Sequence, residues 1–194
     1  MVILENVPLQ DRDLLGRLNQ YFANLDARLR EGQGWLIFNG GRQRASRMTQ
    51  FIIGRLAEQR PFVSYYHVPW RDFALNAYMM HVELPGHKPE STTVLPSTPL
   101  EREYTLAGRV SESQFFQMRY TDVLVVAGVR PARFHEAAHL TSVVDERFRA
   151  RRPTIMVVPG SPAESAEAFH AVDSTDTCWQ RIYDQMYQTS LLAL

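Results

Sequence analysis

The chain has 194 residues, 45% of them hydrophobic, with 21 basic and 21 acidic side chains. This length and composition predict one folded domain spanning residues 1–194 and exclude a disordered chain. The balanced charge argues against general polyelectrolyte binding to nucleic acid or membranes, but leaves local patches open. All basic residues except Lys88 are arginines. A Schiff-base enzyme, or a P-loop enzyme with its standard lysine, would therefore have to use Lys88.

The cysteine count and the hydropathy of the chain bear on its expected cellular location. Cys178 is the single cysteine, which excludes an internal disulfide and a cysteine-based zinc knuckle. The first residues are acidic soon after a short apolar run, unlike a signal peptide, and no apolar stretch approaches the roughly 20 residues that a membrane helix needs. The sequence predicts a cytoplasmic protein without a membrane partner.

Hydrophobic spacing predicts alternating helices and strands. The expected helices cover 10–31, 45–59, 133–150 and 177–188, and the expected strands cover 35–38, 62–68, 122–127 and 154–158. The strands are apolar throughout, which is typical of a mainly parallel sheet buried on both faces, so we expect a three-layer α/β/α fold. The proline-rich stretch 84–105 is expected to be an exposed loop or insertion.

The order of these elements resembles the AAA+ ATPases of the DnaC and IstB type, which are helicase loaders and transposition helpers. Residues 34–56, GWLIFNGGRQRASRMTQFIIGRL, resemble the strand, phosphate loop and helix of that family. The segment TDVLVVAG resembles its Walker B strand, and VVDERFRARRPTIMVV resembles the following helix and sensor strand. The similarity covers about residues 14–83 and 119–192. It implies a P-loop NTPase-like core of the AAA+ or RecA type.

The positions that correspond to the family's phosphate loop are altered. A P-loop wraps phosphates with backbone N–H groups, and its lysine and Ser/Thr bind phosphate and Mg²⁺. This loop has no lysine, and Ser46 or Arg47 takes the lysine position depending on the register. Residues that could still contact a phosphate, another ligand or DNA are Gly40, Gly41, Arg42, Arg44, Ser46, Arg47 and Thr49.

The other catalytic positions implied by the resemblance are altered too. Ala127 and Gly128 stand where Walker B carboxylates would hold Mg²⁺. Pro159 replaces the sensor asparagine, and Gln185 replaces the arginine finger. The resemblance therefore implies a pseudo-ATPase without a cofactor, or one that binds ATP without hydrolysing it. It would serve replication, recombination or transposition by binding a partner ATPase or helicase-like protein, a second copy of itself, or DNA.

Three alternatives stay open. A RecA-like or flavodoxin-like domain unrelated to AAA+ proteins would show the same apolar strands, and a residual ATPase would keep nucleotide binding. His135, Glu136 and His139 match H-E-x-x-H, in which two histidines on one helix face bind Zn²⁺ and the glutamate acts as base. That match would make the protein a zinc-dependent hydrolase. No third-ligand motif is clear, although Glu164 and Glu167 lie at suitable distances in the chain, and we favour a solvated helix face as the explanation of the match.

A second group of arginines also suggests phosphate contacts. It consists of Arg147, Arg149, Arg151 and Arg152 at the end of the helix expected over 133–150. Arginine at this position also complements the helix macrodipole, so the group is open to both interpretations.

Overall fold

A computed structural model of the protein describes residues 9–81 and 99–193. In chain order the elements are α1 (Leu9–Ala23), α2 (Leu25–Glu31), β1 (Gly34–Ile37), α3 (Arg42–Ala57), β2 (Tyr65–Pro69), α4 (Trp70–His81), α5 (Pro99–Tyr120), β3 (Val123–Ala127), α6 (Phe134–Arg149), β4 (Thr154–Val157), α7 (Pro162–His170), α8 (Thr177–Thr189) and β5 (Ser190–Ala193). The chain is an α/β protein, as the hydrophobic spacing predicts.

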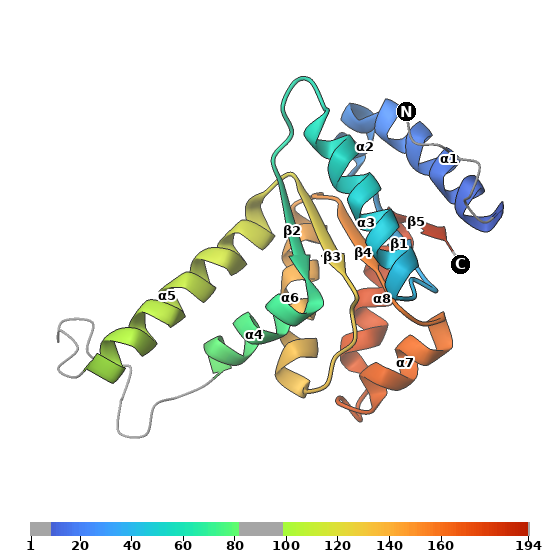
Figure 1. Ribbon diagram of the computed structural model, residues 1–194. Helices are drawn as coiled ribbons and strands as arrows, with labels where there is room; N and C mark the ends of the chain where they lie inside the picture. The colour runs from blue at the N-terminus through green and yellow to red at the C-terminus, as the bar shows by residue number, and fades with distance from the viewer. Residues whose placement is uncertain (1–8, 82–98, 194) are drawn as a thin grey trace.

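The five strands form one parallel sheet in the order β2-β3-β4-β1-β5. Every connection between these parallel strands crosses over a face of the sheet, and the connecting helices cover both faces (Figure 1). The predicted parallel sheet between two helical layers is therefore confirmed.

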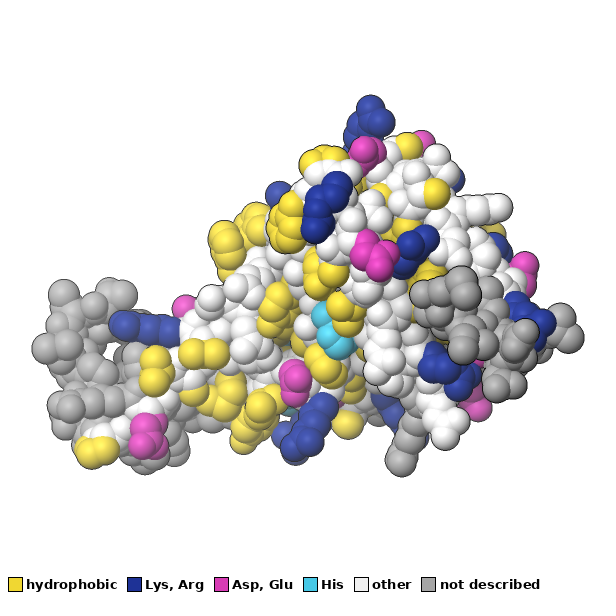
Figure 2. Space-filling model, turned by 45° about the horizontal axis from the view of Figure 1, so that its top comes forward, with side chains coloured by type: hydrophobic (Ala, Val, Ile, Leu, Met, Phe, Trp, Pro, Cys, Tyr) yellow, Lys and Arg dark blue, Asp and Glu magenta, His cyan; other side chains and the backbone are white. Residues whose placement is uncertain are grey.

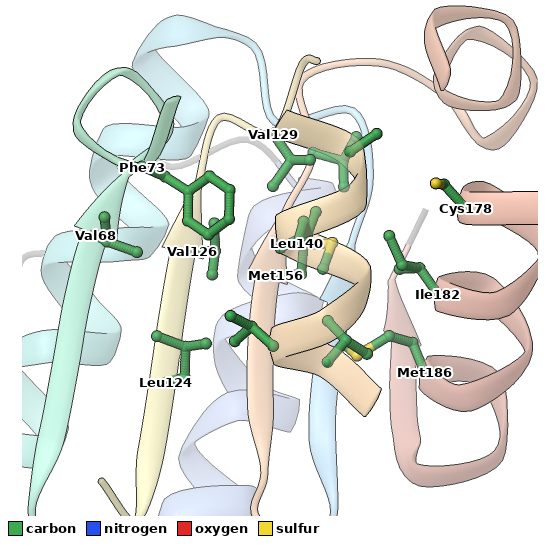
Figure 3. Packing of buried hydrophobic residues seen from close by; sticks show 14 of the residues in the cluster. Val68, Phe73, Leu124, Val126, Val129, Leu140, Met156, Cys178, Ile182 and Met186 are labelled. Carbon is green, nitrogen blue, oxygen red and sulfur yellow. The ribbon is translucent and has the colours of Figure 1, made fainter. Parts of the chain in front are cut away.

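The three central strands, β1, β3 and β4, are almost continuously apolar because their alternate side chains enter two separate cores. Trp35 and Ile37 of β1 pack in one cluster with α1 and α3. Leu36 packs in the other cluster with α4, α6 and α8. Figure 3 shows this second core, where Leu124, Val126 and Met156 of the sheet meet Leu140 of α6 and Ile182 and Met186 of α8.

Several predicted boundaries are wrong. The helix expected over 10–31 is interrupted at Asn24, so that α1 and α2 are separate helices. Residues 99–105, expected in the exposed loop 84–105, begin helix α5, while 84–98 lie outside the described residues. Residues 190–193, which follow the helix expected over 177–188 and for which no strand is predicted, form strand β5 beside β1.

Helices α4 and α5 contact each other and project from the body of the protein (Figure 1). Hydrophobic side chains lie exposed along this arm (Figure 2). No helix in the described part of the chain is long and apolar enough to cross a membrane.

Candidate functional site

The candidate site lies at the carboxyl edge of the sheet, where the loops after β1 and β4 meet. These strands are neighbours, but the helices that follow them cover opposite faces: α3 contributes Ile52 to one core, and α7 contributes Phe169 to the other. In open α/β sheets such a reversal leaves a crevice outside the strand ends, and ligands bind there. The loop predicted to contact phosphate therefore lies where this fold class places ligands.

The backbone of the loop after β1 is already hydrogen bonded within the protein. The Asn39 N–H donates to the Gly160 carbonyl and the Gly40 N–H to the Val158 carbonyl, both at 2.9 Å. The Gly41 N–H donates to the Asn39 carbonyl at 2.9 Å, and Asn39 takes a positive φ of 54°. These three N–H groups bind protein carbonyls, so they are not directed at a ligand phosphate.

The loop is also shorter than the sequence predicts, because α3 begins at Arg42 instead of residue 45. Arginine, glutamine and alanine favour a helix, whereas the glycines of a P-loop would keep this stretch open. The predicted contact residues 42–49 therefore belong to the first turns of a helix. Ser46 is exposed there, and Thr49 is buried.

Two of the predicted phosphate-binding arginines bind a carboxylate of the protein. Arg44 donates through Nε to Oδ1 of Asp11, and Arg47 donates through Nη2 to Oδ2, both at 2.8 Å. Asp11 comes from α1 and is only 2% exposed. Arg44 also donates to the carbonyls of Phe38 and Asn39 at 3.2 Å, which ties α3 back to the loop. Sequence reasoning missed Asp11, because nothing local pairs it with residues 33 and 36 positions away.

The predicted Walker B positions, Ala127 and Gly128, lie at the end of β3 beside β4. Gly128 has a φ of 81° and donates its N–H to the Val157 carbonyl at 2.8 Å. A glycine suits this left-handed conformation, in which a side chain would be strained. Neither residue has a side-chain oxygen that could serve as a Walker B metal ligand at this edge.

An open cleft of about 540 Å³ lies next to these loops. It is lined by Val129, Arg130, Val158, Pro159, Gly160, Glu164, Ser165, Glu167 and Ala168. Of the predicted positions, only Pro159 and the two glutamates fall in it, and Arg130 was missed. The sequence does contain a signal for helix α7, which forms one wall of the cleft, because Ser161 and Glu164 are spaced as a capping box at the start of a helix.

The capping box fixes one wall of the cleft. The Ser161 N–H donates to Oε2 of Glu164 at 2.7 Å, and the Glu164 N–H donates to Oγ of Ser161 at 3.2 Å. The hydrogen bond from the Ser161 backbone lowers the pKa of Glu164. Glu164, Glu167 and Arg130 are exposed, so the rim of the cleft carries charges of both signs.

The residues at the expected arginine-finger position bind within the protein. Arg181 donates through Nε to Asp145 of α6 at 2.9 Å, and Gln185 donates to the same carboxylate. Both side chains thus join α8 to α6.

The H-E-x-x-H residues are not arranged as a metal site. His135 stacks on His81 of α4, and His139 lies against Phe115 of α5. Glu136 is buried and accepts a hydrogen bond from the Ala132 N–H at 2.8 Å. Within residues 9–81 and 99–193, no group of three or more His, Cys, Asp or Glu side chains is placed to hold a metal ion. The geometry gives the zinc-hydrolase hypothesis no support.

No model of a known protein family matches the chain, and no curated protein sequence matches it.

Proposed function

We propose that this chain is a binding module on a P-loop-like scaffold of the AAA+ or RecA type, and that it does not hydrolyse ATP. The observation that carries the proposal is the pairing of Arg44 and Arg47 with the buried carboxylate of Asp11. In this proposal the carboxylate takes the place of a bound phosphate. The arginines then hold α1 against α3 permanently instead of responding to a ligand.

The chemistry of hydrolysis supports the same proposal. Phosphoryl transfer needs Mg²⁺ held by oxygen ligands and a residue that orients the attacking water. The side chains of Ala127 and Gly128 supply neither at the end of β3. A nucleotide at this edge would meet loop N–H groups that already donate to protein carbonyls.

The partner we propose at this edge is a protein, either an ATPase or helicase-like protein or a second copy of the chain. The exposed charges of the cleft are Arg130, Glu164 and Glu167, and two carboxylates would repel the phosphates of DNA. A rim with both signs of charge suits a protein surface of complementary charge. Replication, recombination and transposition are the settings that we propose from the resemblance.

The test compares thermal unfolding with and without ATP–Mg²⁺ in the wild-type protein and in Asp11→Asn and Asp13→Asn. A ligand that binds only the native state raises the midpoint with its concentration. We expect no rise in the wild type, and a rise with ATP or inorganic phosphate in Asp11→Asn, because two guanidinium groups lose their carboxylate. Asp13 is an exposed residue of the same helix, so Asp13→Asn should behave as the wild type.

The second candidate function is nucleotide binding by a residual ATPase, which the cleft beside Gly160 favours. A concentration-dependent rise in the wild-type midpoint, together with phosphate release from ATP, would establish it and overturn the proposal.

A further inference from the structure

A second surface, at the amino edge of the sheet, combines arginines with exposed aromatic rings. It lies where the end of α5 meets the end of α6, before β3 and β4 begin. A groove of about 360 Å³ runs between them. Its lining residues are Arg119, Tyr120, Glu146, Arg149, Ala150 and Arg152.

The positive charge of this groove is only partly neutralised. The single carboxylate in the lining, Glu146, pairs with Arg119 at 3.2 Å. The side chain of Arg149 is 70% exposed, and the nearest carboxylate, Asp145, lies 4.0 Å away and is shared with Arg181. The groove therefore keeps a guanidinium group that faces solvent.

Arg152 is held in place without a carboxylate. It donates through Nη1 to the Arg119 carbonyl at 3.0 Å, and its guanidinium carbon lies 5.2 Å from the centre of the Tyr120 ring. Among the described residues, no carboxylate lies within 4.0 Å of the Arg152 guanidinium as an ion-pair partner. Its position is thus fixed, and no carboxylate of residues 9–81 or 99–193 forms an ion pair with it.

Two aromatic rings extend the groove along α5. Phe116 is 61% exposed and Tyr120 is 50% exposed, and their ring centres are 4.4 Å apart. They lie one helical turn apart on the same face, so their rings are presented together. Together they form an exposed aromatic pair next to the arginines of the groove.

We propose that Phe116, Tyr120, Arg149 and Arg152 form a site for single-stranded nucleic acid, which we name the Arg–aromatic surface. Proteins that hold single strands without sequence preference combine arginines on the phosphates with aromatic rings on which bases stack. The bases of a duplex are stacked on each other and would not be free for Phe116. This site shares no residue with the carboxyl-edge cleft, so the proposal can be tested independently of the proposed function.

The experiment measures the fluorescence anisotropy of a labelled oligothymidylate, as DNA and as RNA, titrated with the full chain at several salt concentrations. We expect binding that weakens steeply with salt. Phe116→Ala should weaken it roughly tenfold or more by removing a stacking platform. Arg149→Ala should reduce the slope of log K against log salt by about 0.7, the value for one phosphate contact on a single strand.

Matched controls come from elsewhere on the surface. Phe62→Ala removes an aromatic ring that is 73% exposed, and Arg30→Ala removes an exposed arginine of α2. Both should bind the strand as the wild type does, and a duplex of equal length should bind more weakly.

Three results would overturn the proposal. They are no binding by the wild type at low salt, equal losses in Phe116→Ala and Phe62→Ala, or equal affinity for duplex and single strand. Sedimentation of the free protein adds a fourth: a dimer that Phe116→Ala dissociates, with no strand bound, would assign the Arg–aromatic surface to a second copy of the chain.

Discussion

The imidazole ring of His135 on α6 stacks on that of His81 at the end of α4, with ring centres 4.9 Å apart and planes 13° apart. Burial lowers the pKa of His135, and this contact lowers it further, because cationic imidazoles repel each other at this distance. Arg133 and Glu136 flank His135, and Arg119 of α5 acts on the neighbouring His139. The contact between α4 and α6 thus favours the uncharged form of His135.

We expect the protein to lose stability as the pH falls below about 6.5, the ordinary pKa of histidine. Burial and then the charge of His81 lower the pKa of His135, and burial and then His135 lower that of His139. The unfolded chain therefore binds more protons than the folded one near these pKa values, so the free energy of unfolding rises with pH. The contribution of these histidines to stability is fully present above about pH 6.5. Urea unfolding between pH 8 and pH 5 measures this, and His135→Gln should flatten the profile. An unchanged profile in His135→Gln would show that other groups cause the loss.

The Arg147 side chain has a structural role that can be tested by substitution. It is fully buried and donates at 2.7–3.3 Å to Oγ1 of Thr154 and to the carbonyls of Met118, Arg119, Thr121, Asp122 and Pro153. Burial lowers its pKa to about 9, which still leaves it charged at pH 7. Arg147→Met should lower the free energy of unfolding by roughly 3 kcal/mol or more, because several carbonyls lose their donor. Arg149→Ala, two residues further along α6, should cost less than about 0.5 kcal/mol. Equal losses in urea unfolding would contradict this role.

Elements of the fold could be predicted from the sequence where their own residues carry the pattern, and not where they depend on a distant strand. The runs Trp35–Phe38, Val123–Val126 and Ile155–Val158 indicated buried parallel strands, because both faces of the sheet are covered. Strand β5 was missed because its identity depends on pairing with β1, in which Trp35 lies opposite Leu191. A short apolar run after a helix does not by itself reveal such a partner.

The site was harder to predict because its partners are distant in the chain. The arginines at 44 and 47 led to a prediction of phosphate, ligand or DNA contact, whereas the anion that they contact in the fold is the Asp11 carboxylate. Likewise, the sequence places Arg147 in one group with the arginines that follow it along the chain. Its side chain is instead fully buried beside the end of α5. The residue type gives the charge of a side chain, but the tertiary structure determines which group pairs with that charge.

The carboxylate of Asp173 holds the first residues of α8 by hydrogen bonds. Substitution of Asp173 is the third test of stability. Its carboxylate accepts hydrogen bonds from the Cys178 N–H at 2.9 Å, from Oγ1 of Thr177 at 3.1 Å, and from the N–H and hydroxyl of Thr175. The Thr175 hydroxyl first, and then the Cys178 N–H, hold the pKa of Asp173 well below its ordinary value of 3.8. Asp173→Ala should cost about 1–2 kcal/mol at pH 7, as the loss of a helix cap does.

The pH dependence of that cost separates a charged cap from a simple packing contact. With a depressed pKa in the fold, the stabilisation by Asp173 is present above about pH 4 and is lost as the pH falls through the folded pKa. Urea unfolding of wild type and Asp173→Ala at pH 7 and at decreasing acid pH should give converging free energies. Asp184→Ala, at an exposed position of α8, is the control and should differ little from the wild type throughout. A constant difference across the range would contradict the assigned role.

The two glycines after β1, Gly40 and Gly41, allow a test of whether the loop is adapted to packing against β4 or to binding a ligand. A Cβ on Gly40 would lie 2.8 Å from Cγ1 of Val157 and 3.1 Å from the Val158 carbonyl oxygen, whereas a Cβ on Gly41 meets nothing within 4 Å. Gly40→Ala should therefore lower the free energy of unfolding by about 1–3 kcal/mol, the usual cost of overpacking. Gly41→Ala should stay within about 1 kcal/mol of the wild type.

The comparison is made by urea unfolding without ligand. In a working phosphate loop, the glycines let the backbone approach the phosphates, so their replacement reduces ligand binding. Here Gly40 brings the loop against β4, and its N–H donates to the Val158 carbonyl at 2.9 Å. The cost of Gly40→Ala should therefore appear in the ligand-free protein. Equal stability of Gly40→Ala and Gly41→Ala, with ATP–Mg²⁺ stabilisation lost only in Gly40→Ala, would instead mean that the loop still holds a nucleotide.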